Sequence, residues 1–594
     1  MAAIVEFIGS RVATIDSADA GTNVLAVKMA GGGGSPSETA ADTSIQGGQA
    51  VGMTYPSANR FNTLTYDIVT AGGTALNFSA GGANENQLLY VWANALFPMV
   101  STGNVQDNAY GGLGITISDN ANILNSWANF TFYGVENYPG GWVRLCIDPT
   151  LVPTSSGGTF APASLSSIRK VGIFFVAGNN ARSDALVLDA IDVGSGIRIY
   201  DSGTSDNGFG DLLSFDQGDS NNRYGVITSL EESDTVINIL GTLEIGDPTG
   251  TTQAVFDDIN KVIVIENPQY INSTQTAFVN SIPDEFLKIK CVGNTTSGTD
   301  ITFGEKVGDG DEARGRNGLT FLGPSNAKAD FVFNLDDNVD TLSLYGTTLR
   351  SFNPTGNLIW NTSGNHEFIG STLDNCSRLE PDSGVVIRNC TFLNHSSNSI
   401  IDSGALLFTS NPPDDQVIDI KNCSFVANDR AIQHESSGTF TYDGFSFSDN
   451  TFDVFFSTGT ASDLVVNVTN PVTPAASITA TTGAAGSTVS FLSSFTLTIT
   501  GFVNGSELFM RNATDGTTNI VERFNEESAI GSYEYTYDDA LSLVDLFVLK
   551  ATGDPNAPDE NDRPYQWLSF RDFSLPSTSQ QLLVQQVLDR NYTN

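Results

Sequence analysis

The stretch SGVVIRNCTFLNHSS, residues 383–397, contains a short phrase that returns along the chain. Within it, Asn389, Cys390 and Thr391 stand directly before Phe392. The same order of types, a small polar residue followed by a small or hydroxyl residue and then an apolar one, begins again at 422 as NCSF and at 449 as DNTF. Looser copies, GTTL and GSTL, begin at 346 and 370. The middle of the chain is therefore a repeat.

The intervals between the five copies are uneven, from 19 to 33 residues. Tandem units such as ankyrin repeats or propeller blades keep a fixed period, whereas a parallel β-helix keeps its strands and lets its loops vary. The alternative is chance, since Asn, Ser and Thr are abundant in this chain. Five copies in one order favour a parallel β-helix.

Equivalent side chains in successive turns of a β-helix lie about 4.8 Å apart. We therefore expect a column of Asn amides bonded along a ladder, a second column of Thr and Ser, and a third, apolar column pointing inward. Phe392 and Phe425 belong to this inward column. Three of the five cysteines, Cys376, Cys390 and Cys423, belong to the repeat or its flank, which predicts stacked free thiols.

The composition is strongly acidic, with 67 Asp and Glu against 27 Lys and Arg and a formal net charge of −40. Such a surface argues against nucleic acid and anionic lipid as partners. Gly, Asn, Ser, Thr and Phe richness favours strands and tight turns, so we expect an all-β protein. With no CxxC pair and no His at metal spacing, no metal and no cofactor is predicted. The acidic segment 308–312 lacks the spacing of a calcium loop.

The chain of 594 residues is long enough for several domains. Residues 1–195 predict a β-sandwich of jelly-roll or lectin type, because alternating apolar segments are separated by Gly, Asn and Pro clusters. Trp92, Trp127 and Trp142 lie in or beside these strands and are candidate carbohydrate-binding residues; the alternative is that they are core residues.

Residues 196–462 predict a right-handed parallel β-helix, from which the polar segment 305–321 is expected to project as a loop. Residues 463–576 predict a smaller, immunoglobulin-like β-sandwich. Residues 577–594 predict a short helical tail, because Leu583 and Val587 are four residues apart and Ser579 can cap a helix. The three histidines, His366, His395 and His434, are expected to be ordinary surface residues.

No export signal and no membrane-spanning run are found in the sequence. An extracellular-looking protein without such a signal is one that cell lysis can release. No membrane insertion is expected.

The β-helix motifs, together with the segments GSELFMRNATDG at 505–516, VDLFVLKA at 544–551 and DRNY at 589–592, resemble tailed-bacteriophage virion appendages of the tail spike and fibre type. The resemblance covers most of the chain at the level of architecture. It implies a virion location, other virion proteins as partners, a homotrimer in many members, and a role in attachment to host surface polysaccharide.

Three functions fit this resemblance: a non-enzymatic tail fibre, spike or head appendage that attaches to glycans, a polysaccharide depolymerase, and a capsid decoration protein. Depolymerases of this shape use paired carboxylates, and Asp336, Asp337 and Asp340 are the candidate catalytic residues. The alternative is that such acids are solvated, because 67 acidic residues make adjacent carboxylates common. The sequence favours the non-enzymatic appendage.

Overall fold

The computed structural model describes residues 4–591 apart from a set of gaps. The gaps are 31–33, 43, 46, 56–59, 96–112, 133–140, 178–181, 201–225, 228–235, 247, 249–253, 257–261, 272–277, 295, 297–298, 324–333, 336–338, 352–365, 377, 382–383, 397–402, 410–418, 471, 515, 518, 526–531, 538–540, 542, 560–561 and 576–578.

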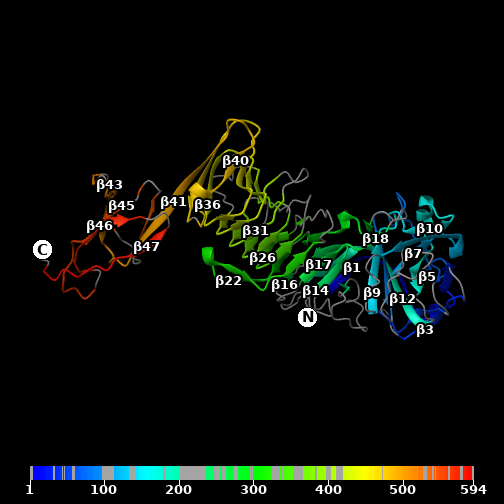
Figure 1. Ribbon diagram of the computed structural model, residues 1–594. Coiled ribbons are helices and arrows are strands. Elements are labelled where there is room, and N and C mark those ends of the chain that lie inside the picture. The colour runs from blue at the N-terminus through cyan, green and yellow to red at the C-terminus, as the bar shows by residue number, and fades with distance from the viewer. Residues whose placement is uncertain are drawn as a thin grey trace. The chain divides into compact units, whose positions relative to one another are not determined.

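The described residues are almost entirely strands, and the helical elements among them are 3-10 segments such as η4 (Pro162–Ser167). The prediction of an all-β protein is therefore confirmed. The chain divides into two compact units (Figure 1). Unit 1 is Met1–Val386 with Asn394–Asp402, and unit 2 is Ile387–Leu393 with Ser403–Asn594.

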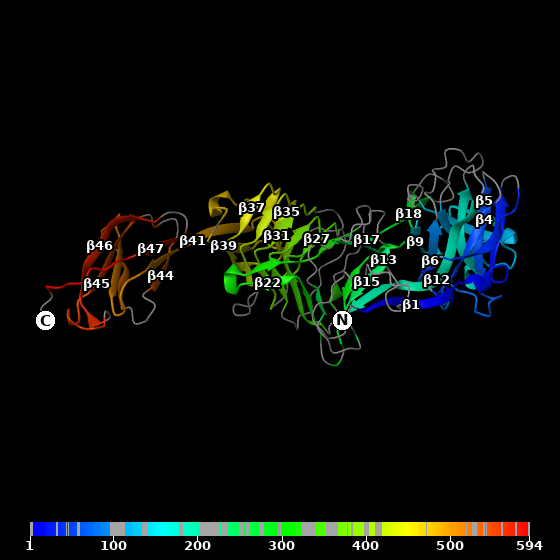
Figure 2. The ribbon, with the colours of Figure 1, turned by 90° about the horizontal axis from the view of Figure 1, so that it is seen from below.

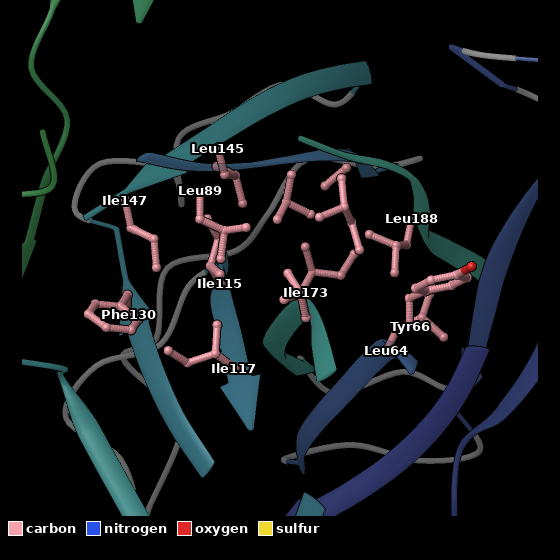
Figure 3. Packing of buried hydrophobic residues seen from close by; sticks show 14 of the residues in the cluster. Leu64, Tyr66, Leu89, Ile115, Ile117, Phe130, Leu145, Ile147, Ile173 and Leu188 are labelled. Carbon is pink, nitrogen blue, oxygen red and sulfur yellow. The ribbon is translucent and has the colours of Figure 1, made fainter. Parts of the chain in front are cut away.

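Unit 1 begins with two antiparallel groups of strands that enclose one apolar core (Figure 3). Leu89, Leu145 and Leu188 come from the first group, and Ile115 and Ile173 face them from the second. The first group contains β1 (Ile4–Thr14), β3 (Ser37–Ala41), β4 (Ala50–Tyr55), β6 (Leu88–Ala95), β9 (Gly141–Ile147) and β12 (Arg182–Tyr200). The second, in the order β10-β8-β7-β11-β5-β2, contains β2 (Val24–Ala30), β5 (Arg60–Asp67), β7 (Leu113–Ser118), β8 (Ser126–Thr131), β10 (Ser155–Gly158) and β11 (Lys170–Ala177).

The 19-residue strand β12 belongs to two kinds of sheet at once. Its Leu186–Gly194 part pairs antiparallel with β6, and Gly196–Ile199 pairs parallel with β15 (Thr242–Ile245) (Figure 2). A Cβ atom on Gly196 would lie only 1.9 Å from the backbone oxygen of Thr242, so glycine permits this close pairing. The antiparallel sheet and the parallel strands after it are thus joined without a linker.

Most of the remaining described strands of unit 1 are parallel and stacked in three ladders, which the chain visits in the order first, second, third. The exceptions are antiparallel: β13 (Val226–Ile227) pairs with β14, β18 (Gln269–Ile271) pairs with β19 (Phe278–Asn280), and a hairpin lies at 305–316. The first ladder contains β14 (Val236–Leu240), β17 (Val262–Glu266), β24 (Thr320–Leu322), β27 (Thr348–Arg350) and β29 (Thr372–Asp374). The second contains β12, β15, β20 (Ile289–Cys291) and β25 (Asn334–Leu335). The third contains β16 (Ala254–Phe256), β21 (Thr299–Phe303), β26 (Val339–Tyr345) and β28 (Glu367–Ile369).

Unit 2 has parallel strands of the same kind. Its first ladder contains β31 (Thr391–Leu393), β34 (Ser424–Val426) and β37 (Ser446–Ser448). The second contains β32 (Leu406–Phe408), β35 (Arg430–His434), β38 (Phe452–Phe456) and β40 (Ala480–Thr482). The third contains β33 (Asp419–Lys421), β36 (Gly438–Asp443), β39 (Asp463–Thr469) and β41 (Thr488–Thr500), so parallel pairing continues beyond residue 462. We call the parallel strands of each unit its stacked region.

The inward apolar column is confirmed in unit 2. Phe392 and Phe425 are buried and stack with ring centroids 5.1 Å apart, and the ring of Phe447 continues the stack at 5.3 Å from Phe425. All five cysteines are free and buried, as predicted.

The first residue of the repeated phrase has a backbone role. Asn389 and Asn422 have φ of 55° and 54°, and Gly346 and Gly370 have φ of 59° and 63°. This left-handed conformation is accessible to Gly and, with a small penalty, to Asn and Asp. A side-chain amide bond across one turn does occur, but it joins Asn428 to Asn450 at 3.0 Å.

The fifth copy was assigned to the wrong position. Phe447, not Phe452, lies beside Phe425 in the ladder, so the fifth copy is GFSF at 444–447. Asp449 has a φ of 57° and stands at the following turn, which leads into β38. Both turns of each repeat require a left-handed residue, so both attract the same residue types.

The three histidines are buried, and the expectation that they lie on the surface is wrong. Nδ1 of His366 accepts a hydrogen bond from the backbone N–H of Leu342 at 3.0 Å. His434 stacks on Phe408, with ring centroids 4.9 Å apart, and its Nε2 lies 2.6 Å from the hydroxyl of Tyr442. Ring stacking and backbone bonds make these histidines interior residues.

The polar segment 305–321 does not project as a loop. It begins with a hairpin of β22 (Glu305–Val307) and β23 (Arg314–Arg316). A Cβ atom on Gly315 would lie 2.1 Å from the backbone nitrogen of Gly346, and Nζ of Lys306 lies 3.0 Å from the carboxylate of Glu367. The hairpin is therefore packed against neighbouring turns of the stacked region.

Unit 2 ends in two further sheets around one core. The Phe495–Thr500 part of β41 pairs antiparallel with β44 (Ser532–Tyr537). The other sheet has the order β43-β42-β45-β46 and is antiparallel. Its strands are β42 (Glu507–Asn512), β43 (Asn519–Asn525), β45 (Leu543–Lys550) and β46 (Tyr565–Ser574).

The prediction of a helix in residues 577–594 is wrong for the part of this segment that the structure describes. Gln580–Leu583 form a strand, β47, which pairs parallel with β41. Leu583 and Val587, the expected apolar face, are 63% and 59% exposed, whereas Val584 is fully buried. The burial alternates with a period of two, and pairing with β41 supplies backbone partners that a helix of one or two turns would have to replace.

Candidate functional site

Two of the three candidate tryptophans lie together on the face of β6 and β9 that points away from the core. Trp92 is only 1% exposed and packs against Ile45 and Ala190, and the half-buried Trp142 packs against the same residues. Trp92 therefore has the packing of a core residue. It has no surface on which a sugar ring could stack.

The third tryptophan, Trp127 on β8, belongs to the other sheet and is half-buried. Its ring centroid lies 6.4 Å from that of Phe61, and Phe61 stacks on Phe174 at 5.2 Å. A Cβ atom on Gly157 would lie 2.5 Å from the indole ring, so the ring rests against the backbone of β10. Successive residues of a strand point to opposite faces of the sheet. These aromatic residues therefore share the face that points away from the core shown in Figure 3.

A row of polar side chains crosses this same face. Thr65 pairs with Gly172, Gly172 with Thr116, and Thr116 with Asn129, so four neighbouring strands each contribute one residue. All four positions point away from Leu64, Ile115 and Phe130, their core-facing neighbours in sequence. We call Thr65, Thr116 and Asn129 the polar row.

The side chains of the polar row are fully buried. Among the described residues, the hydroxyl oxygens of Thr65 and Thr116 and both amide atoms of Asn129 have no hydrogen-bond partner. More than nine in ten buried polar groups in proteins are paired, and each unpaired group costs about 1–3 kcal/mol. All four atoms are enclosed by protein, so the row, like Trp92, has no surface open to a ligand.

Charged groups border the polar row at one end. The carboxylate of Asp67 lies 2.9 Å from the guanidinium of Arg169 and 3.1 Å from Nζ of the buried Lys170. Burial alone would raise the pKa of Asp67, but the backbone N–H of Thr70 and these two cations outweigh burial and lower that pKa below its usual value. Asp67 therefore stays ionised and neutralises the buried lysine.

A second buried polar cluster lies on the outer face of the other sheet, and it has a structural explanation. The guanidinium of Arg144 lies 4.2 Å from the ring centroid of Tyr90, 4.8 Å from that of Phe7 and 3.4 Å from the carboxylate of Asp192. Burial lowers the pKa of Arg144, against the attraction of Asp192. The hydroxyl of Tyr90 donates to the backbone oxygen of Leu240 at 3.1 Å, which fixes this face to the first strands of the stacked region.

Of the candidate catalytic acids, Asp340 alone lies in the described part of the chain. Asp340 is an exposed residue of β26, and Asp336 and Asp337 lie outside the described residues. The search for metal centres found no group of three or more His, Cys, Asp or Glu side chains placed to hold an ion in the described part of the chain. None of the helical segments described has the length and hydrophobicity that a membrane-crossing helix requires.

Sequence reasoning identified Trp127 as a candidate but missed the polar row beside it. In the segment FNTLTYD, at 61–67, Thr and Leu alternate, and such a pattern predicts a solvated polar face. The sequence carries no sign that this polar face is buried. Only the register of four strands brings the row together.

No protein-family model matches the chain. No curated protein matches its sequence. Among solved structures, the catalytic domain of a GH87 alpha-1,3-glucanase in complex with tetrasaccharides aligns over 80% of this chain and 86% of its own, with 10% identity and a TM-score of 0.18. The catalytic domain of a GH87 alpha-1,3-glucanase in complex with nigerose aligns over 79% and 98%, with 9% identity and a TM-score of 0.18. Similarity at this level shows no shared fold and supports no inference about activity.

Proposed function

We propose that the chain is a structural protein of a bacteriophage virion, a tail fibre, spike or head appendage, that contributes to attachment to host-surface glycans. In this proposal the stacked regions form a right-handed parallel β-helix between a jelly-roll, lectin-like sandwich and an immunoglobulin-like sandwich. Other virion proteins and a homotrimer of this chain are part of the proposal.

One observation carries the structural role: each stacked region shares a continuous strand with an antiparallel sheet. In unit 1 this strand is β12. In unit 2 it is β41, which pairs parallel with β39 through residues 488–494 and antiparallel with β44 through residues 495–500. A shared strand excludes a flexible linker at that point. Such a design suits a stiff spacer that presents binding domains, whereas an enzyme of a single pocket does not require it.

The glycan role is supported by Trp127, a candidate tryptophan on the outer face of the second sheet whose ring is only half-buried. Sugars offer apolar C–H faces that stack on aromatic rings, and hydroxyl groups that pair with polar side chains. A few convergent polar groups beside aromatic side chains are the usual composition of a small-ligand site. The acidic net charge of −40 agrees with a partner other than nucleic acid.

Gold-labelled antibodies against the purified chain, applied to phage particles from lysates in which the gene is expressed, test the virion location. We expect label on an appendage of the tail or head. Unlabelled particles, with the chain left in the soluble fraction, would contradict the proposal. Sedimentation of the purified chain measures whether it is a trimer.

An array of purified bacterial capsular polysaccharides and lipopolysaccharides tests the glycan role. Binding without new reducing ends supports attachment, and new reducing ends support the depolymerase instead. Binding to empty capsids and to no glycan supports capsid decoration. Trp127→Ala should weaken glycan binding, whereas Thr63→Ala is the control, because Thr63 lies on the same face but is fully buried and its hydroxyl already donates to the backbone oxygen of Val27 at 3.3 Å.

A further inference from the structure

The outer face of the last antiparallel sheet carries three aromatic rings in a line. Phe509 on β42 pairs directly with Phe547 on β45, with ring centroids 5.7 Å apart. Trp567 on β46 continues the line, with its ring 5.6 Å from that of Phe547 in an edge-to-face arrangement. These residues alternate with Leu508, Leu546 and Leu568, which pack in the core, so the three rings point away from it.

Trp567 is 62% exposed, which sets this face apart from ordinary sheet surfaces. Exposed large apolar side chains that are clustered, rather than scattered, mark binding sites on proteins. Phe547 is buried beneath its neighbours and Phe509 is half-buried. The line of rings is therefore buried at Phe547 and exposed at Trp567.

Two arginines lie on the same face and are held in place by one carboxylate. Oδ2 of Asp545 lies 2.9 Å from Nη2 of Arg511 and 2.8 Å from Nη1 of Arg571. The other oxygen of Asp545 accepts a hydrogen bond from the backbone N–H of Asp572 at 3.0 Å. That bond, followed by the two guanidinium groups, lowers the pKa of Asp545, so the carboxylate is ionised at neutral pH.

The aromatic rings and the arginines form one surface. The guanidinium carbon of Arg571 lies 4.4 Å from the ring centroid of Phe547, and that of Arg511 lies 5.7 Å from it. We call Arg511, Phe547, Trp567 and Arg571 the platform. Two cations share the carboxylate of Asp545 there, and the acidic Asp572 follows Arg571 directly, so the formal charges of these four residues balance and the preference for an anion rests on the free guanidinium donors.

The platform has capacity for a further anion. A guanidinium group carries five N–H donors in a planar fork that matches a carboxylate. Among the described residues, Arg571 directs one terminal nitrogen to Asp545, and its side chain is 55% exposed. Its remaining donors therefore face solvent on the same face of the sheet as Trp567.

We propose that the platform is a binding site for an acidic oligosaccharide, a glycan whose sugars carry carboxylate groups. The carboxylate accepts hydrogen bonds from Arg571 and Arg511, and the C–H face of the sugar ring stacks on Trp567. The choice of a glycan rests on the attachment role proposed above, but the site is separate from the polar row. The charge and the fork geometry select acidic over neutral sugars.

Binding of fluorescent oligogalacturonate to the full chain tests this site, with the same oligosaccharide after reduction of its carboxyl groups to alcohols as the matched probe. We expect the acidic probe to bind at least tenfold more tightly, and to weaken as salt is raised. Trp567→Ala and Arg571→Gln should each weaken binding at least tenfold. Arg316→Gln is the control, because it removes an equally exposed arginine from the β22–β23 hairpin.

Equal binding of the two probes, no binding of the acidic probe, or unchanged binding in both platform variants would overturn the proposal. Loss of incorporation into phage particles in Trp567→Ala, with oligogalacturonate binding unchanged, would show a protein partner and would also overturn it. Failure of the attachment role is seen separately, as unlabelled particles in the antibody experiment. Circular dichroism checks that each variant is folded.

Discussion

The outer faces of the two antiparallel regions place their polar and aromatic side chains in opposite ways. In unit 1 the polar row is buried, with four unpaired atoms among the described residues, whereas in unit 2 the indole of Trp567 is exposed on the same face as two arginines. Folding alone favours neither arrangement, since buried polar groups and exposed apolar clusters are both unusual. Both faces depart from the burial rule, in opposite directions, and each departure can be tested by its effect on stability.

The interior of the stacked region obeys the burial rule and gives the largest expected effect. Phe425→Ala removes the middle ring of the Phe392–Phe425–Phe447 stack and should lower the free energy of unfolding by about 3–5 kcal/mol. Urea unfolding followed by fluorescence measures this. Phe425→Leu is the control and should lose far less. Equal stability of the Ala variant and the parent would contradict the inward register.

His434 is a buried polar side chain inside the stacked region, and its effect on the free energy of unfolding can be compared with that of the polar row. Burial lowers its pKa from 6.5 to about 3, so the unfolded chain binds a proton that the folded chain does not take between these values. Stability from this group is fully present above pH 6.5 and is lost as pH falls toward 3, by about 1.4 kcal/mol per pH unit. His434→Phe should reduce the slope of unfolding free energy against pH in that window. An unchanged slope would show that His434 is protonated in the folded state.

The polar row tests whether its unpaired hydroxyls cost stability. Thr116→Val replaces a hydroxyl that has no partner among the described residues by a methyl group of similar shape and should raise the free energy of unfolding by about 1 kcal/mol. Thr63→Val removes a hydroxyl that donates to Val27 and should lower stability by about 1 kcal/mol. Both values come from thermal unfolding. If Thr116→Val is destabilising, ordered water satisfies that hydroxyl in the folded protein.

The platform gives the smallest effect on stability. Trp567→Ala should change the free energy of unfolding by less than about 1 kcal/mol, because most of its surface is already in water. Calorimetry of the full chain measures it. A loss of several kcal/mol would mean that the indole is held by packing rather than kept for a ligand.

The sequence predicted the features that depend on residue type at one position. Phe392 and Phe425 were placed inward and the cysteines were kept as free thiols, and both predictions are confirmed. These predictions succeed because the burial of an apolar residue can be inferred from its type, without knowing which strand pairs with it. The second left-handed turn of each repeat was not recognised, since Asn375, Asn394 and Asp449 attract the same types as the first turn.

Features that depend on pairing between distant strands could not be predicted. The last strand was read as a helix, because Leu583 and Val587 fit a helical spacing that pairing of β47 with β41 overrides. Nothing in the sequence shows that a single strand, β12, crosses residue 195 and belongs to two sheets. The polar row and the platform arise from register, which no single segment carries.

The shared strand β12 also has a mechanical consequence. Its hydrogen bonds to β6 and β15 lie across the strand, so tension applied along β12 loads many of them together in shear rather than opening them one by one. A junction of this kind resists pulling far better than a hinge, which yields at a few bonds. Under tension along β12, a segment held by fewer strand-to-strand hydrogen bonds would yield first.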